Sequence, residues 1–238
     1  MFVLHISTTD IEGGAARAAF RLNQSLNNNK NLDIKSSLLV LRKFSDDKNV
    51  FAACSKFGSY KSKIKNFLAV KIQKLQSTNN KVLHSSAIFS SNILKIINDS
   101  KADIIHLHWI QGEMISVEDI GKIEKKVIWT FHDTWPFCGS EHYPNGLDDE
   151  RYMQGYLRKN RGKDHFGIDL DKLVWDRKNR NWTKKYSIVC PSNWMRSCVI
   201  KSKLMSDWPV YKIPHALPIN IFKPLPKILS RELFNLPK

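Results

Sequence analysis

Short apolar runs alternate with amphipathic stretches over the first 131 residues of the chain. The runs are rich in Val, Ile, Leu and Phe, which is typical of strands that are buried in a sheet. Strands are predicted over residues 2–6, 34–41, 103–109 and 127–131, and helices between them over residues 15–26, 60–76, 90–98 and 116–122. This alternation indicates a parallel sheet with helices on both faces. We therefore expect an α/β, Rossmann-like fold.

The same alternation resumes after a central loop. A basic helix, a strand, a second helix that Ser192 caps and a short strand are predicted over residues 169–184, 187–190, 192–203 and 210–213. Residues 214–226 are rich in proline, which interrupts helices and central strands, and a last helix begins near Ser230. We expect residues 1–213 to form one Rossmann-like domain, and residues 214–238 to form a linker and the start of a second domain.

The chain is strongly basic, with a formal net charge of +16 over 238 residues and a pI of about 9.7. Such a charge favours a polyanionic partner, which could be nucleic acid, an anionic membrane or a phosphorylated substrate. The other explanation is a solvated surface built from lysine. Since the sequence contains no helix-turn-helix, zinc-finger or aromatic RNA-binding motif, we expect no nucleic-acid partner.

One basic segment has the spacing of an amphipathic helix. Residues 60–76 place aromatic and aliphatic side chains at helical intervals with lysines between them. A helix of this kind can lie on an anionic membrane, or its apolar stripe can pack against the sheet. Both interpretations are open.

Cysteine spacing and hydropathy give expectations about metal sites and location. The four cysteines, Cys54, Cys138, Cys190 and Cys198, contain no Cys-x-x-Cys pair, which argues against a disulfide framework or a zinc site. This usage fits a reducing compartment. The N-terminus lacks the basic region of a signal peptide, and no segment is apolar enough to cross a membrane. We expect a cytoplasmic protein, with a peripheral position on a membrane as an alternative.

A pair of glycines follows the first predicted strand. Gly13 and Gly14 precede a segment of high helix propensity, so the chain reads strand, glycine turn, helix. Glycines allow close backbone approach, and the free N–H groups at a helix start favour an anion. The same turn would also allow tight packing of the helix on the strand. The spacing differs from the G-x-G-x-x-G fingerprint, which gives little support to a dinucleotide site.

Polar chemistry follows the strand at residues 127–131 directly. His132 and Asp133 lie at its carboxyl end, where open parallel sheets bind their ligands. A His-Asp pair at this place could be catalytic, or it could be a feature of the loop. Trp135 follows it, and Trp109 follows the strand before it; a tryptophan at a strand end either stacks on a sugar or belongs to the core.

Two further histidines lie at alternate positions on the strand at residues 103–109. We expect His106 and His108 to point to opposite faces of the sheet, with one of them in a substrate cleft or bonded to a backbone carbonyl. Together with His132 and His142 they could suggest a metal cluster. Because no acidic residue or cysteine has a suitable spacing, we expect no metal.

Several separated segments together resemble one family. These are Gly13 to Arg17, DIIHLHWIQG (residues 103–112), VIWTFHDTWPFCGSEHY (127–143), VCPSNWM (189–195) and IPHALPINIFKPLP (213–226). Their order and spacing resemble the N-terminal half of glycosyltransferase family 4, and most closely the enzymes that build colanic acid, O-antigen or capsular polysaccharide. Ser140-Glu141 and residues 152–156 stand where relatives often have cysteines, so no metal site is expected in that loop.

The resemblance implies a GT-B fold and a retaining glycosyltransferase. Its substrates would be a nucleotide-sugar donor and a lipid-linked saccharide acceptor, with no cofactor or metal. His132 would then lie against the donor sugar as a catalytic residue, with Asp133 orienting its ring or accepting a proton. Gly13, Gly14 and Arg17 would bind the donor phosphate, with a solvated Arg17 as the alternative, and His106, His108, Trp109 and Trp135 would line the acceptor cleft.

The resemblance also implies a C-terminal donor-binding domain, supplied by a longer chain or by a separate one. In the family, the diphosphate-binding and paired-glutamate motifs lie C-terminal to the part that residues 1–238 resemble. Activity of these residues alone is therefore not expected. The alternative is a non-catalytic, basic Rossmann-like module that binds an anionic membrane or a partner subunit.

Overall fold

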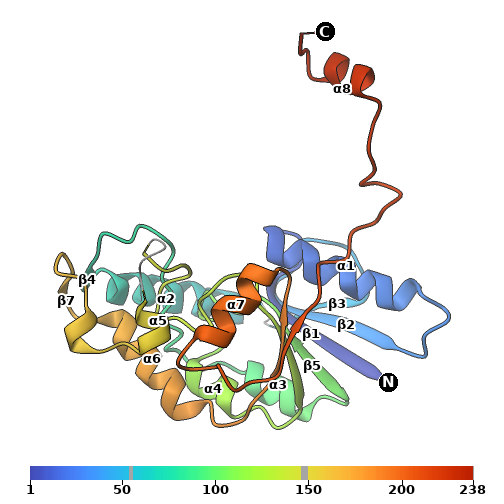
Figure 1. Ribbon diagram of the computed structural model, residues 1–238. Coiled ribbons are helices and arrows are strands. Elements are labelled where there is room, and N and C mark those ends of the chain that lie inside the picture. Colours follow the sequence, from blue (N-terminus) through green and yellow to red (C-terminus); the bar gives the residue numbers. More distant parts are fainter. Residues whose placement is uncertain (54–55, 146–149, 238) are drawn as a thin grey trace.

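A seven-stranded parallel sheet forms the centre of the protein (Figure 1). The computed structural model describes residues 1–53, 56–145 and 150–237. In spatial order the strands are β3 (Val50–Ala52), β2 (Lys35–Arg42), β1 (Phe2–Thr9), β5 (Ile104–Leu107), β6 (Lys126–Thr130), β8 (Ser187–Cys190) and β9 (Val210–Lys212). All neighbouring pairs are parallel, so the predicted α/β, Rossmann-like fold is confirmed.

Helices cover both faces of this sheet. The helices of the described residues are α1 (Gly14–Asn28), α2 (Lys56–Gln73), α3 (Ile93–Asp99), α4 (Val117–Gly121), α5 (Arg151–Gln154), α6 (Leu170–Asn181) and α7 (Asn193–Lys201), with a 3-10 helix, η1 (Arg158–Asn160), and a last helix, α8 (Lys227–Leu233), that lies apart from the sheet. On one face, Ala19 of α1 packs on Leu38 and Val40 of β2. The other face belongs to a larger core that takes side chains from α3, α4, α6 and α7.

The apolar strands divide their side chains between the two faces by their period of two. Leu4 and Ile6 of β1 belong to the larger core, while His5 lies between them and is fully buried on the α1 side. The chain turns from β1 to β2 on one side of the sheet and later to β5 on the other. The sheet therefore has its topological switch point between β1 and β5, which is where folds of this kind bind ligands.

Local signals in the sequence account for several helix starts. The Ser192 hydroxyl accepts a hydrogen bond from the Met195 backbone N–H, which confirms the predicted cap of α7. Ser116 caps α4 in the same way through the Asp119 N–H. The short strand β3 and the antiparallel pair β4 (Gln76–Ser77) and β7 (Phe166–Gly167) were not predicted, because strands of this length carry too little hydrophobic pattern.

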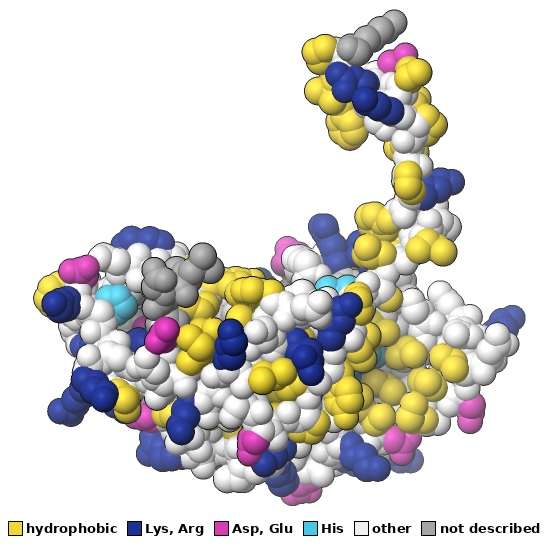
Figure 2. All heavy atoms as spheres, in the orientation of Figure 1, with side chains coloured by type: hydrophobic (Ala, Val, Ile, Leu, Met, Phe, Trp, Pro, Cys, Tyr) yellow, Lys and Arg dark blue, Asp and Glu magenta, His cyan; other side chains and the backbone are white. Residues whose placement is uncertain are grey.

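The chain leaves the sheet after β9. The first residues of the segment 214–237 still lie near the sheet, where His215 stacks on His132, and the rest runs outward and ends in α8, well apart from the sheet (Figure 1). Their hydrophobic side chains are largely exposed, as Figure 2 shows for the extension, with Ile228 73% and Phe234 73% accessible. The division into residues 1–213 and a linker with a second domain stays a prediction.

One buried lysine fixes the loop that follows β6. The Lys178 ammonium of α6 donates hydrogen bonds to the backbone carbonyls of Trp135, Cys138 (3.1 Å) and Gly139 (2.7 Å). Its Nζ also lies 3.7 Å from the centroid of the Trp135 ring, where a cation–π interaction compensates part of the burial cost. Because Lys178 is fully buried, no water replaces these contacts if the ammonium is removed.

We predict that Lys178→Met lowers the free energy of unfolding by about 3 kcal/mol, because buried carbonyls lose their donor. Urea denaturation followed by tryptophan fluorescence measures this change. The matched control is Lys172→Met on the same helix, whose partly exposed ion pair with Asp176 contributes less than about 0.5 kcal/mol. Equal denaturation midpoints for the two variants would contradict the anchoring role of Lys178.

Candidate functional site

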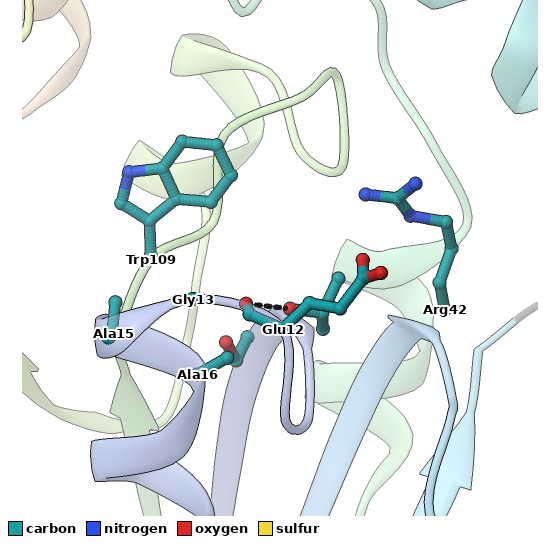
Figure 3. A pocket seen from close by; sticks show the side chains of 9 residues that line it. Glu12, Gly13, Ala15, Ala16, Arg42 and Trp109 are labelled. Carbon is teal, nitrogen blue, oxygen red and sulfur yellow. Dashed lines mark hydrogen bonds between the residues drawn. The ribbon is translucent and has the colours of Figure 1, made fainter.

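Two adjoining pockets lie at the carboxyl ends of β1, β5 and β6, at the switch point of the sheet. The glycine-turn pocket, of about 280 Å³, is lined by Ser7, Thr9, Glu12, Gly13, Gly14, Ala15, Ala16, Arg42 and Trp109 (Figure 3). The histidine pocket, of about 670 Å³, is lined by Gly14, Ala15, Val82, Leu83, Trp109, His132, Asp133, His142, Tyr143 and His215. Gly14, Ala15 and Trp109 belong to both, so the pockets form one cleft.

The glycine-turn pocket has the features of an anion site. Gly13 caps α1 with a φ of 90°, a conformation that favours glycine, and it has no side chain to occupy the first-turn N–H groups. The Arg42 guanidinium points into the pocket from the end of β2 (Figure 3). The Ser7 hydroxyl is buried at its base and has no hydrogen-bond partner within the described residues.

Arg17 does not line this cleft. Its side chain is exposed, and its Nε donates a hydrogen bond to the Ile11 carbonyl at 3.1 Å. This hydrogen bond stabilises the turn before α1 on its solvent-exposed side. The cation inside the pocket is Arg42, which no motif in the sequence singled out, because it lies at the end of a different strand.

In the histidine pocket, Trp109, His132 and His215 come from three separate segments. His132 follows β6 and stacks on His215 of the C-terminal segment, with ring centroids 4.9 Å apart and an interplanar angle of 13°. The Trp109 ring follows β5 and forms the boundary with the glycine-turn pocket. Of the predicted cleft residues, His132, Asp133, Trp109, Gly13 and Gly14 therefore lie together.

Asp133 connects the segments around the histidine pocket. Its Oδ2 accepts hydrogen bonds from Trp109 Nε1 at 2.8 Å and His142 Nδ1 at 2.6 Å, and its Oδ1 accepts one from the Trp135 backbone N–H at 3.1 Å. Within the described residues the structure shows no hydrogen bond between His132 and the Asp133 carboxylate. The carboxylate positions Trp109 and His142 instead of orienting the neighbouring imidazole.

His142 links Asp133 to a serine in an arrangement that resembles a hydrolase triad. The Ser85 hydroxyl lies 2.8 Å from His142 Nε2, on the ring edge opposite Asp133. Ser85 is 6% exposed, however, and lines neither of the two pockets. Its backbone N–H donates to the Ser140 carbonyl and its carbonyl accepts from Trp135 Nε1. Because its backbone is held by these two contacts, Ser85 fixes the orientation of the His142 ring and is not exposed to a substrate.

His106 and His108 lie below the cleft and are absent from its lining. Their ring centroids are 4.2 Å apart, so the expectation that they point to opposite faces is wrong. Residues two apart on a strand share a face, and His5 of β1 joins them because it is the register partner of His106. Trp135 is also buried, at 1% exposed, and belongs to the core.

Burial keeps these imidazoles neutral. It lowers the pKa of His5 to about 3 and that of His132 to about 4. Burial also holds the pKa of His106 and of His108 well below the usual value, and neighbouring histidines add to the effect. At neutral pH each ring therefore carries one N–H and one lone pair.

Three of the rings are close enough to share a metal ion. His5, His106 and His108 each bring a ring nitrogen within 4.8 Å of the other two. In the structure one nitrogen of each ring already has a partner: His5 Nδ1 lies 3.1 Å from His108 Nε2, and His106 Nε2 lies 2.8 Å from the Thr130 hydroxyl. The group contains no acidic residue that would neutralise a divalent cation.

Comparison with known proteins supplies no family assignment. No protein-family model matches the chain, and no curated protein matches it.

We predict that Asp133→Asn lowers the free energy of unfolding by about 2 kcal/mol. The carboxylate accepts hydrogen bonds at both oxygens, whereas the amide has one NH2 group, which would face an N–H donor instead of accepting from it. Loss of the Trp109 contact also changes its fluorescence. The control is Asp207→Asn, which removes only an exposed ion pair with Lys185. If both variants retain the stability and emission of the parent protein, Asp133 does not organise the cleft.

Proposed function

We propose that this chain is the acceptor-side part of a retaining glycosyltransferase, which transfers a sugar from a nucleotide-sugar donor to a saccharide acceptor, and that its own cleft also contacts the diphosphate and the sugar of that donor. The supporting observation is the continuous cleft at the switch point, in which an anion site and an aromatic, histidine-lined pocket share Trp109. A nucleotide sugar has the same two parts, a diphosphate and a sugar, joined directly.

The diphosphate matches the glycine-turn pocket. The first-turn N–H groups of α1, the Ser7 hydroxyl and the Arg42 guanidinium are all hydrogen-bond donors around one small volume. The Glu12 carboxylate also lines the pocket, on the Arg42 side of the turn (Figure 3), and it opposes an anion there. A departing nucleotide diphosphate carries growing negative charge, which donors fixed in advance would stabilise.

The sugar matches the histidine pocket. The Trp109 and Tyr143 rings offer apolar surfaces, and His132 adds a ring nitrogen for hydrogen bonding to a hydroxyl or to the departing oxygen. Asp133 holds Trp109 in place from behind. In the completed enzyme the acceptor hydroxyl would approach the same face of this sugar, and the transfer would need no metal or other cofactor.

The wider proposal follows the family resemblance. The acceptor would be a lipid-linked saccharide in the synthesis of a bacterial surface polysaccharide, at the cytoplasmic side of the membrane. A donor-binding domain of GT-B type, in a longer chain or a separate one, would close over the cleft and complete the enzyme.

Nucleotide binding tests the proposal. We predict that UDP or GDP, or a sugar derivative of either, binds to the protein in isothermal titration calorimetry. Arg42→Ala should weaken this binding roughly 10- to 100-fold, because one charge-assisted contact with the diphosphate is lost. The neighbouring variant Lys43→Ala is the control, since Lys43 Nζ donates to the Asp47 carbonyl outside the cleft.

Gly14→Val adds a steric test at the point where the pockets meet. A Cβ at Gly14 meets no atom within 4 Å, so we expect the added side chain to project into the pocket without a clash with the fold. Binding should then be lost while the urea denaturation midpoint stays unchanged. Absence of binding by the parent protein, or equal binding by the parent, Arg42→Ala and Gly14→Val proteins, would refute the proposed site.

A second candidate function, docking on an anionic membrane, is favoured by helix α2. Its Ala69 is buried and Ile72 packs on the core, but Phe67 is 60% and Val70 48% exposed. Ile64 and Leu68 are exposed as well, and lysines 63, 71 and 74 lie among them at the surface. Only part of the apolar stripe of α2 is therefore buried against the core, and the rest is exposed. The side chains of residues 56–62 lie outside the description, as does Cys54.

Across the part of the chain that the structure describes, every helix is too short or too polar to span a membrane.

Liposome flotation tests the docking function. We predict that the protein floats with vesicles that contain anionic lipid and is released as the salt concentration rises, because the lysines act through screened charge. Phe67→Ser combined with Val70→Ser should reduce flotation. The control pair is Phe51→Ser and Leu32→Ser, which are similarly exposed but lie elsewhere. No flotation of the parent protein at low salt would exclude this function.

A further inference from the structure

Three histidines form a hydrogen-bonded row from the centre of the sheet to the cleft. His5 Nδ1 lies 3.1 Å from His108 Nε2, and His108 Nδ1 lies 3.2 Å from His132 Nε2. We call these three residues the histidine row. Its inner end, His5, is fully buried, and its outer end, His132, lines the histidine pocket. His132 Nδ1 is the ring nitrogen that the row leaves available to a ligand.

The strands impose this order. His5 of β1 and His106 of β5 are register partners, and His108 follows two residues later on the same face. His106 pairs in turn with Ile128 of β6, so His132 lies beyond the end of β6 on the next strand across. The row therefore crosses the sheet obliquely over β1, β5 and the end of β6, toward the carboxyl ends where the cleft lies.

If both hydrogen bonds of the row are kept and all three rings are neutral, only two combinations of histidine tautomers are possible, which we call the first and the second setting. A neutral imidazole has one N–H and one lone pair, so His108 must donate at one nitrogen and accept at the other. In the first setting each Nδ1 carries the proton, and His132 presents an N–H to the cleft. In the second setting each Nε2 carries it, and His132 presents a lone pair. The inner end thereby determines what the outer end offers.

The inner end favours the first setting. His5 Nε2 is buried and has no hydrogen-bond partner among the described residues. The second setting would leave an N–H donor unpaired there, which proteins avoid more strictly than an unpaired acceptor. The Asp133 carboxylate, beside His132 at the outer end, also favours an N–H at the cleft over a lone pair.

We propose that His5 and His108 are positioning residues that hold His132 as its Nδ1–H tautomer, so that His132 donates a hydrogen bond into the cleft. For its use in catalysis this inference rests on the proposed function. There His132 would donate to a sugar hydroxyl or to the departing phosphate oxygen, and it would not serve as the base that deprotonates the acceptor. The tautomer itself is a property of the protein without substrate.

The experiment is nitrogen NMR on the complete protein with selectively ¹⁵N-labelled histidine. Long-range ¹H–¹⁵N correlations distinguish protonated from unprotonated ring nitrogens. We expect His5, His108 and His132 as Nδ1–H tautomers, with N–N couplings across both hydrogen bonds of the row. His84 and His142 are internal references, because their Nδ1 donates to the Val82 carbonyl and to the Asp133 carboxylate. Single substitutions at each position assign the signals.

Two variants test whether the row controls His132. His108→Leu removes the donor to His132 Nε2, so the Nδ1–H fraction of His132 should fall toward that of free histidine. His108→Gln supplies an amide N–H to the same nitrogen and should restore the Nδ1–H form. If His108→Leu unfolds the protein, the signals of the parent protein and of His108→Gln still decide.

Several results would overturn the inference: an Nε2–H tautomer or a doubly protonated His132 in the parent protein at neutral pH, or no response of His132 to His108→Leu. One equivalent of Zn²⁺ is added as a final step. Loss of the His5–His108 coupling at that step would assign these nitrogens to a metal site instead. Failure of nucleotide binding would refute the proposed function alone, since none of these spectra depends on a ligand.

Discussion

The cleft depends on one buried carboxylate. Asp133 accepts hydrogen bonds from the Trp109 indole, the His142 imidazole and the Trp135 backbone, and so it joins the end of β5 to the loop after β6. Without it the buried His142 ring and Trp135 backbone N–H would lose their acceptor, and the partly exposed Trp109 indole would lose the contact that holds it. Lys178 secures the same loop from the opposite side through backbone carbonyls. The walls of the cleft are therefore fixed by polar contacts before any substrate arrives, which lowers the cost of binding and of charge stabilisation.

A parallel sheet is normally filled with aliphatic side chains on both faces, and this sheet departs from that rule at its switch point. On the α1 side, His5, His106 and His108 occupy positions where the neighbouring strands have leucine and valine. Burial keeps their pKa values low, so they enter the core as neutral groups that bond to one another and to Thr130. Burying polar side chains at such a place costs free energy of folding, which is consistent with a role for them in the cleft above.

Much of the fold could be predicted from the sequence, because the strands predicted over residues 2–6 and 127–131 are largely apolar runs and Ser192 is a strong cap. The position of His132 at a strand end was equally visible. Arg42 and Ser7 could not be recognised, since only the pairing of β1 with β2 brings them to the glycine turn. His5 was overlooked because a histidine within an apolar strand has no local motif, and its partner His108 is 103 residues away. The period of two, applied correctly, would have placed His106 and His108 on one face.

In the proposed complex, the diphosphate of a nucleotide sugar occupies the glycine-turn pocket while the sugar reaches His132 in the histidine pocket. Backbone and indole NMR shifts, recorded during titration with UDP-glucose and with GDP-mannose, test this most directly. We expect saturable shifts at the amides of Gly14, Ala15 and Ala16, at Trp109 Nε1 and at the His132 ring. Shifts confined to the lysines of α2, or no saturable shift with either compound, would contradict it.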